Sequence, residues 1–258
     1  MQLYLAVTPE LVESALTLTP HLAHAAFRVS ADGTLLSRPL PPRLRGGLAV
    51  IQCDTPFPES AAPALSRELL RLCLQRDFRG IVPDGFTRAT AAHRSLCAAL
   101  DALCSRYGRR LYVPPCCADE APHAAVLVCT ALSGGTLREL LRDAIQRFGA
   151  RRIALDLQRL MMEFPLPCPS GEGAPLTPQE LRQRMTGRSI YYCDSLCARY
   201  FTRSEDGKTR FVLFDDADTL RRKMTLAEEL GITEGFLMWP EVCDIAPALF
   251  AKKKEGEP

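Results

Sequence analysis

Short apolar runs recur along the chain, and most are followed by a segment whose apolar positions repeat at helical spacing. Apolar runs with few polar positions are typical of strands that are buried on both faces of a parallel sheet. The eight runs cover residues 3–7, 21–29, 47–53, 80–84, 110–113, 124–130, 152–157 and 235–239. We therefore expect eight strands that run in one direction, with helices between most of them.

The segments between these runs carry amphipathic patterns. In residues 60–76, Leu65, Leu69 and Cys73 recur on one side of a helix, while charged residues occupy the other side. Similar stripes predict helices within residues 9–18, 96–104, 137–148 and 216–231. Residues 115–123 are too short for a helix that crosses between strands. The pattern favours an α/β fold, a (β/α)8 TIM barrel, over an open sheet.

The regular alternation stops between residues 165 and 214. A loop with Gly171 and Gly173 precedes a capped helix start at Thr177, and the short runs 189–193, 199–202 and 210–214 are typical of antiparallel strands. We expect a small α+β insertion between the seventh and eighth barrel strands. The chain is then a single barrel domain of residues 1–251, followed by a disordered basic and polar tail of residues 252–258.

Composition and charge exclude several classes of protein. Hydrophobic residues make up 47% of the 258 positions, which is sufficient for a full core. A net charge of +2 gives no field that would favour nucleic acid or a membrane surface, and no apolar stretch is long enough to span a bilayer. The eleven cysteines are scattered through helical and strand patterns, and the first residues carry no signal-peptide pattern. We therefore expect a cytoplasmic protein with reduced thiols.

In a barrel of this kind, reactive groups lie at the carboxyl ends of the strands. The polar and aromatic residues at such positions are Asp54, Asp84, Thr130, Asp156, Glu163, Trp239 and Glu241. Asp84 differs from the others because it lies between two glycines in the sequence, Gly80 and Gly85. Each of these carboxylates could instead cap a helix, and that structural role is the alternative for every one of them.

Trp239 is the single tryptophan of the chain and follows the last predicted strand. An indole at this position could form the floor of a cavity and pack against the C–H face of a sugar ring. The alternative is ordinary packing in the core. We therefore group Trp239 with Asp54, Glu163 and Glu241 as candidate substrate-binding residues.

The sequence contains no motif typical of a metal site, a serine hydrolase or a nucleotide-binding enzyme. The pairs Cys116-Cys117, Cys193-x-x-x-Cys197 and His21-x-x-His24 have no partner pair at zinc-finger or zinc-ribbon spacing, so we expect no metal. The sequence contains no nucleophile elbow, phosphate-binding glycine loop or dinucleotide fingerprint. We therefore expect no cofactor.

Several segments of the carboxyl-terminal part, taken in order, resemble the family 18 glycoside hydrolases, the chitinase-like barrels. They are residues 152–155, 164–167, 176–180, 214–223 and 235–239. The resemblance is strongest to the bacterial branch related to spore-cortex and peptidoglycan N-acetylglucosaminidases. It implies a TIM barrel with an insertion after the seventh strand, a partner that is a glycan containing N-acetylglucosamine, and a spore-associated location.

The same resemblance places a catalytic acid at the fourth strand, and this chain departs from it there. Phe78-Arg79-Gly80-Ile81 keeps the frame of the family motif, Asp84 falls on its last aspartate, and Phe86 stands where the family has its glutamate. In that family the sugar's own acetamido group attacks, and the glutamate protonates the leaving oxygen. A phenyl ring cannot donate this proton. Thr130-Ala131 and Leu160 also depart from the family pattern.

Three hypotheses follow. The leading one is a non-catalytic barrel that binds N-acetylglucosamine-containing glycans or serves as a scaffold for a protein partner. The second is an active glycosidase in which Glu163 or Glu241 replaces the missing acid, with Asp84 as its partner. The third is a structural protein without a ligand, which predicts a cleft filled by side chains.

Overall fold

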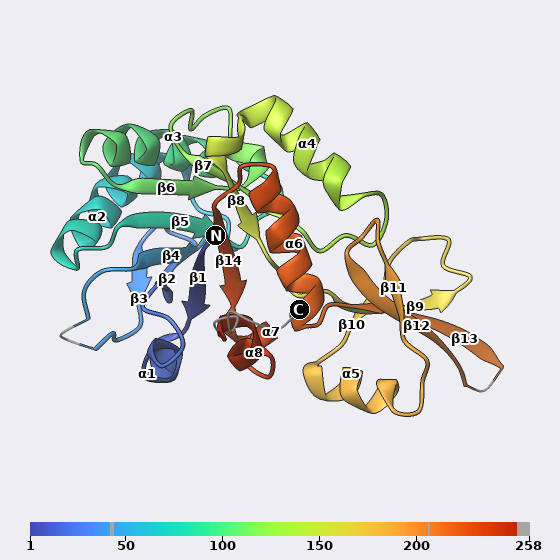
Figure 1. Cartoon of the computed structure of the whole chain (residues 1–258). Coiled ribbons are helices and arrows are strands. Elements are labelled where there is room, and N and C mark those ends of the chain that lie inside the picture. The colour runs from blue at the N-terminus through green and yellow to red at the C-terminus, as the bar shows by residue number, and fades with distance from the viewer. Residues whose placement is uncertain (42–43, 206, 252–258) are drawn as a thin grey trace.

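The computed structural model describes residues 1–41, 44–205 and 207–251, and the predicted tail of residues 252–258 lies outside this described part. Eight parallel strands of the described chain form a barrel (Figure 1). They are β1 (Gln2–Val7), β2 (Leu22–Val29), β4 (Leu48–Gln52), β5 (Gly80–Asp84), β6 (Arg110–Val113), β7 (Ala125–Cys129), β8 (Ile153–Asp156) and β14 (Glu234–Met238). Pairing follows chain order, and β1 closes the barrel by pairing with both β2 and β14. The predicted (β/α)8 barrel is confirmed.

Helices surround the barrel where the amphipathic stripes predict them. The main ones are α1 (Val12–Leu16), α2 (Ala62–Gln75), α3 (Ala91–Arg106), α4 (Leu137–Phe148) and α6 (Ala217–Glu229). Shorter turns are η1 (Pro9–Leu11), η2 (Glu59–Ala61), η3 (Pro115–Cys117) and η4 (Ala150–Arg152), and α7 (Trp239–Val242) and α8 (Ala246–Phe250) follow β14. Asp216 caps α6 by accepting a hydrogen bond from the Thr219 N–H at 2.9 Å. In the described chain, η3 is the only helical element between β6 and β7, as the short segment predicts.

The sequence analysis did not predict the hairpin that extends β2. Strand β3 (Leu35–Ser37) pairs antiparallel with the end of β2, after the turn at Gly33, where φ is +85°. This strand is short and mostly exposed, so it lacks the apolar run by which buried strands are found.

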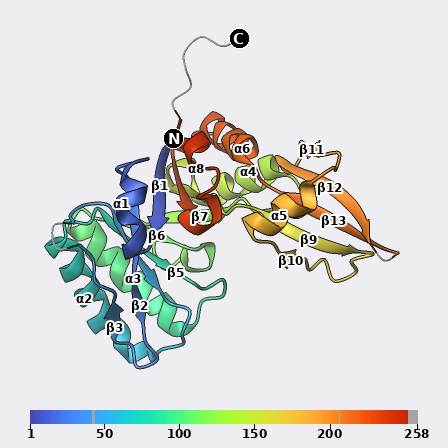
Figure 2. The same ribbon diagram turned by 90° about the horizontal axis from the view of Figure 1, so that it is seen from below.

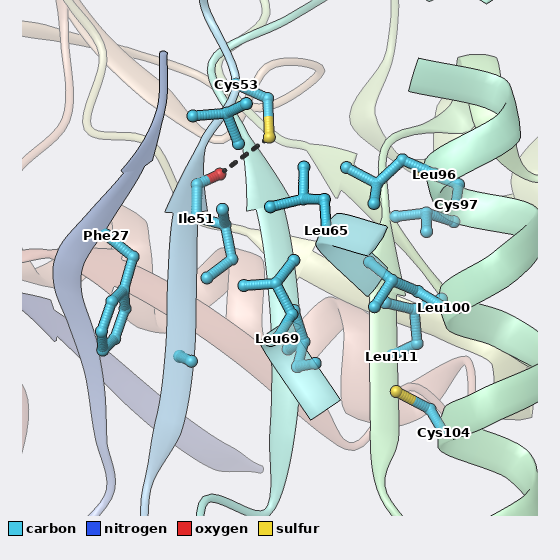
Figure 3. Packing of buried hydrophobic residues seen from close by; sticks show 14 of the residues in the cluster. Phe27, Ile51, Cys53, Leu65, Leu69, Leu96, Cys97, Leu100, Cys104 and Leu111 are labelled. Carbon is cyan, nitrogen blue, oxygen red and sulfur yellow. Dashed lines mark hydrogen bonds between the residues drawn. The ribbon is translucent and has the colours of Figure 1, made fainter. Parts of the chain in front are cut away.

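Two layers of apolar side chains hold the barrel together. Alternate residues of the strands point inward and fill the barrel, among them Tyr4, Val82, Tyr112 and Phe236. The remaining strand residues point outward and pack against the helices. Figure 3 shows Leu65 and Leu69 of α2 and Leu96 and Leu100 of α3 meeting Ile51 and Leu111.

Several cysteines act as small apolar residues in this outer layer. Cys53, Cys97 and Cys104 are at most 1% exposed, and Figure 3 shows them among the leucines. Burial raises the pKa of the Cys53 thiol to about 12, so this side chain stays neutral. All eleven cysteines lie in the described part of the chain and are free thiols.

The insertion between β8 and β14 is a second sheet beside the barrel (Figure 2). Its strands are β9 (Met161–Leu166), β10 (Ala174–Pro175), β11 (Tyr191–Cys193), β12 (Ala198–Glu205) and β13 (Lys208–Phe214), in the order β10-β9-β13-β12-β11. Helix α5 (Pro178–Met185) begins at the predicted cap, where Thr177 and Glu180 exchange hydrogen bonds. Leu181 of α5 packs against Phe201, Val212 and Phe214 of the sheet.

Strand β9 begins before the predicted insertion and changes the position of Glu163. The sequence analysis treated Glu163 as a residue at the end of the seventh barrel strand. In the structure Glu163 lies within β9 and is opposite Val212 of β13, inside the second sheet. The difference arises because Met161 to Phe164 show no clear alternation that would separate a new strand from a loop.

A buried ion pair joins the insertion to the barrel. The Lys223 ammonium of α6 donates to the Asp215 carboxylate at 2.7 Å and to the Thr130 carbonyl oxygen at 3.1 Å, and both charged side chains are 0% exposed. Asp215 also accepts from the Leu160 N–H and the Thr219 hydroxyl. The residue after β7, the start of the insertion and α6 therefore meet at this ion pair.

No helix in residues 1–41, 44–205 and 207–251 has the length and apolar content needed to cross a membrane.

Candidate functional site

A cavity of about 780 Å³ occupies the carboxyl end of the barrel. Its floor consists of inward-facing strand residues, chiefly Val82, Leu127, Phe236 and Met238. Polar side chains border this floor, and a wall formed by the β5–α3 loop, η3 and α4 rises on one side. The lining of the rim and wall includes Asp84, Phe86, Arg94, Cys116, Asp119, Cys129, Arg147, Asp156, Gln158 and Glu241.

The strands bring together three carboxylates that are far apart in the sequence. Asp84 ends β5, Asp156 ends β8 and Glu241 lies in α7, directly after β14, and all three line the cavity. Burial raises the pKa of Asp156 to about 6, and the negative charges of Asp84 and Glu241 add to this effect. Asp156 is therefore a carboxyl group that exchanges its proton near neutral pH.

Glu241 is tied to the segment that leads into the insertion. Its carboxylate accepts a hydrogen bond from the Arg159 N–H at 3.0 Å, and its carbonyl oxygen accepts one from the Arg159 guanidinium at 2.8 Å. Burial raises the pKa of Glu241, whereas the interactions with Arg159 lower it. Glu241 is thus held in one place at the edge of the cavity.

The two cations of the cavity wall have carboxylate partners of their own. Arg94 pairs with Glu120 and also donates to the Cys116 carbonyl oxygen at 3.1 Å. Arg147 pairs with Asp119 at 3.3 Å. The charges of Arg94 and Arg147 are therefore matched by carboxylates other than Asp84, Asp156 and Glu241.

Phe86 lies in the loop between β5 and α3 and is held in place by a stacking contact. Its ring lies on the His93 imidazole with the ring centroids 4.0 Å apart and the planes at 10°. The imidazole Nε2 donates to the Cys53 carbonyl oxygen at 3.0 Å, and Nδ1 accepts from the Thr90 N–H at 3.2 Å. Because burial also lowers the pKa of His93, the imidazole is neutral, and neither Phe86 nor His93 offers a proton to the cavity.

The turn that carries Phe86 requires a glycine. Gly85 has a φ of +88°, in the left-handed region that favours glycine. A Cβ atom at Gly85 would also lie 3.2 Å from the Cβ of Asp54. Gly85 therefore redirects the chain between Asp84, at the end of β5, and Phe86, in the wall.

Trp239 does not line this cavity or the adjoining one, as far as the described residues define them. Side chains alternate along a strand. Phe236 and Met238 of β14 point into the barrel, so the side chain of the next residue, Trp239, points away from it. Trp239 is partly buried and packs against the apolar layer between the barrel and its helices. Met238 is therefore the inward residue near the end of β14. Trp239 packs in the apolar core, which is the alternative role considered for it above.

Three further candidates lie outside the cavity lining. Asp54 is exposed and pairs with Arg28 at 3.0 Å. Glu163 is 9% exposed and is held by Arg184 at 3.0 Å and Arg203 at 2.9 Å. Thr130 is fully buried, and its hydroxyl donates to the Asp156 carbonyl oxygen at 3.3 Å. The structure therefore groups Asp84 with Asp156 and Glu241, and it leaves Asp54, Glu163 and Thr130 apart.

Some lining residues were not predicted from the sequence. Cys129 precedes Thr130 at the end of β7, and its thiol donates to the Gln158 side-chain oxygen at 3.5 Å. Strand alternation could have identified Cys129 in place of Thr130. Arg94 and Arg147 lie in helices, where the rule for strand ends does not apply, so no local pattern could have identified them.

A second cavity, of about 660 Å³, lies between the barrel and the inserted sheet. Arg159, Phe164, Gly173 and Leu176 are part of its lining. Gln158 and Glu241 line both cavities, so the two adjoin at these side chains. Among the described residues, no group of three histidine, cysteine, aspartate or glutamate side chains is placed to hold a metal ion.

Comparisons with known proteins rest on structure. No family model matches the sequence, and no curated protein matches it. Among solved structures, the spore cortex-lytic enzyme SleL of Bacillus megaterium QM B1551 is similar with a TM-score of 0.66 at 18% identity, over 93% of this chain and 70% of that chain. A chitinase from Chromobacterium violaceum has a TM-score of 0.66 at 14% identity, with coverages of 96% and 98%. The chain has the fold of the family 18 glycoside hydrolases.

A third similar structure contains a sugar. It is a GH18 chitinase from Cycas revoluta in complex with (GlcNAc)4, with a TM-score of 0.64 at 13% identity over 97% of this chain and 98% of that chain. The fold implied by the family 18 resemblance is thereby confirmed, and both chitinases and a spore cortex-lytic enzyme are among the similar structures.

Proposed function

We propose that this family 18-like barrel binds a glycan containing N-acetylglucosamine at the carboxyl end of the barrel and does not hydrolyse it by the family reaction. The observation that carries the proposal is Phe86, which lines a cavity of about 780 Å³ and is stacked on a neutral His93. A cavity of this volume accommodates a sugar-sized ligand. The third hypothesis, a structural protein, predicts a filled cleft, which this volume does not support.

The chemistry of the lining favours a carbohydrate. Phe236 and Met238 offer an apolar floor for the C–H face of a sugar ring, and Asp84 and Gln158 offer acceptors and donors for hydroxyl groups. The adjoining cavity at Glu241 extends the space toward the insertion. A similar fold in complex with (GlcNAc)4 adds support for this ligand class.

Isothermal titration of the full chain with N-acetylglucosamine oligomers and muropeptides tests the proposal. We expect saturable heat for the native protein and no release of reducing ends. The substitution Asp84→Asn should weaken binding by about threefold to tenfold, because the carboxylate loses strength as a hydrogen-bond acceptor. The exposed Asp143→Asn, on α4, is the matched control and should bind like the native protein. Absence of heat for every oligomer would refute glycan binding.

Hydrolysis by a displaced acid is a second candidate, favoured by the raised pKa of Asp156. A carboxyl group whose pKa is raised toward neutral pH is typical of the acid in glycosidases. Asp156, with a pKa near 6, would donate the proton, and Asp84 would act opposite it. Of the acids first proposed for this role, Glu241 lines the cavity, whereas Glu163 is held in the second sheet.

A reducing-sugar assay across pH distinguishes this candidate. If Asp156 is the acid, release of reducing ends should fall as the pH rises above about 6, because the carboxyl loses its proton. Asp156→Asn should lower the rate by about 10² to 10⁴. Activity that survives Asp156→Asn, Asp84→Asn and Glu241→Gln would exclude these three residues as the acid.

The cytoplasmic or spore-associated location is also a proposal. Immunodetection in separated spore and cytoplasmic fractions of the source cells tests it.

A further inference from the structure

The lining of the cavity includes carboxylates that have few cationic partners. Among the described residues, neither Asp84 nor Asp156 forms an ion pair, although both line the cavity. Glu241 lies beside them and has a single cationic neighbour, Arg159, whose guanidinium pairs with Asp244. The other cations of the lining, Arg94 and Arg147, lie on the wall and have their own carboxylate partners. These carboxylates are therefore available to a positively charged group of a ligand.

The repulsion within this group has a measurable effect on the empty site. The charges of Asp84 and Glu241 both raise the pKa of Asp156, in addition to the effect of burial. A cation placed between these carboxylates would relieve the repulsion and hold Asp156 in its charged form. Among the described residues, no group of three side chains is placed to hold a metal ion, so we consider a cation that belongs to an organic ligand.

The rest of the lining determines what kind of ligand can carry this cation. An apolar floor of Val82, Phe236 and Met238 borders the carboxylates, so the ligand must present an apolar face close to its positive charge. A hexosamine with a free amine has this combination, because its ring has a C–H face and its C2 nitrogen is an ammonium. An N-acetylated unit is neutral at the same position and leaves the carboxylates unpaired.

We propose that the cavity prefers a glucosamine unit that has lost its acetyl group, with the ammonium seated between Asp84 and Asp156. This inference rests on the proposed glycan-binding function and narrows it to partly de-N-acetylated chains. The missing acid at Phe86 is consistent with it, since a free amine cannot take part in the acetamido-assisted reaction. The ammonium would donate charge-assisted hydrogen bonds to both carboxylates.

Titration calorimetry with matched tetrasaccharides tests the inference. Glucosamine tetramer should bind the full chain at least about tenfold more tightly than N-acetylglucosamine tetramer at pH 7, as a charge-assisted hydrogen bond implies. Asp84→Asn and Asp156→Asn should each remove most of this preference, because each should weaken binding of the glucosamine tetramer by at least about threefold more than binding of the N-acetylated tetramer. Asp143→Asn on the exposed face of α4 should leave both affinities unchanged.

Two further measurements separate this inference from simpler explanations. The preference for the glucosamine tetramer should shrink between pH 7 and pH 5, because Asp156 takes up a proton over this range. The other titratable and charged groups of the cavity lining are Asp84, Cys129, Glu241, Asp119, Arg94 and Arg147. Spermine, a cation without a sugar ring, should bind more weakly than the glucosamine tetramer. Equal affinity for the two tetramers, or for spermine and the glucosamine tetramer, would overturn the inference but not the proposed function. Absence of binding by either tetramer would overturn both.

Discussion

Replacing Lys223 with methionine is expected to lower the free energy of unfolding by about 3–5 kcal/mol, one of the largest effects of any single change in this chain. The ammonium is 0% exposed and lies 2.7 Å from Asp215, which is equally buried. Methionine fills a similar volume but leaves the buried Asp215 carboxyl group without its cation. Burial already raises the pKa of Asp215, so the variant should fold with this carboxyl protonated. Urea denaturation at pH 7 measures the loss.

Two companion variants identify the cause. The double change Lys223→Met with Asp215→Asn removes both charges and keeps an acceptor for the Leu160 N–H, so it should recover at least half of the lost stability. Arg138→Met breaks an exposed pair with Glu229 and should cost no more than about 1 kcal/mol. A loss at Lys223→Met as small as that at Arg138→Met would show that this pair is not needed for stability.

Acidification from pH 7 to pH 4 is expected to act in opposite directions at His24 and Asp156. His24 is 1% exposed, its Nδ1 has no hydrogen-bond partner among the described atoms, and burial lowers its pKa from 6.5 to about 4. The neutral ring therefore contributes stability above pH 6.5, and this contribution is lost as the pH falls toward 4. The loss reaches about 3 kcal/mol, since one pKa unit corresponds to about 1.4 kcal/mol.

Asp156 has the opposite sign. Its folded pKa of about 6 lies above its ordinary value of 3.8, so the folded state binds the proton first and gains stability as the pH falls through 6. The gain is also about 3 kcal/mol. The native protein should therefore change little in stability between pH 6 and pH 4 from these two groups together.

Single variants uncouple the two effects, and urea denaturation at several pH values reads them. Asp156→Asn should lose stability steeply between pH 6 and pH 4, because the His24 contribution is no longer offset. His24→Leu should gain stability over the same interval. Parallel curves for both variants and the native protein would rule out this assignment, and Asp143→Asn serves as the control for a carboxylate on the surface.

The barrel could be predicted from the sequence because its strands are buried on both faces. A strand such as Gly80–Asp84 or Ala125–Cys129 then contains a continuous apolar run, which stands out from the amphipathic helices. The missed strands, Leu35–Ser37 and Met161–Leu166, belong to a hairpin and to an antiparallel sheet with one partly exposed face. Their pairing depends on partners distant in the sequence, which no local pattern shows.

The candidate site could be predicted only in part, for a related reason. Finding the end of a strand identifies a residue near the barrel mouth, and Asp84, Asp156 and Glu241 were found in this way. Finding which of two neighbouring residues faces inward requires the register to within one position. Without that register, the sequence points to Trp239 and Thr130, whereas the residues that line the cavity are their neighbours Met238 and Cys129. Glu163 lies outside the cavity for a different reason, because it belongs to strand β9 of the second sheet.

The stacking of Phe86 on His93 has a consequence for how this chain could change. His93 forms the cap of α3 together with Thr90, and the phenyl ring covers that cap. A glutamate at position 86 would bring a carboxylate against an imidazole whose two nitrogens are already engaged. Phe86 thus helps to hold the amino-terminal end of α3, and an acid placed at position 86 is expected to disturb that helix terminus.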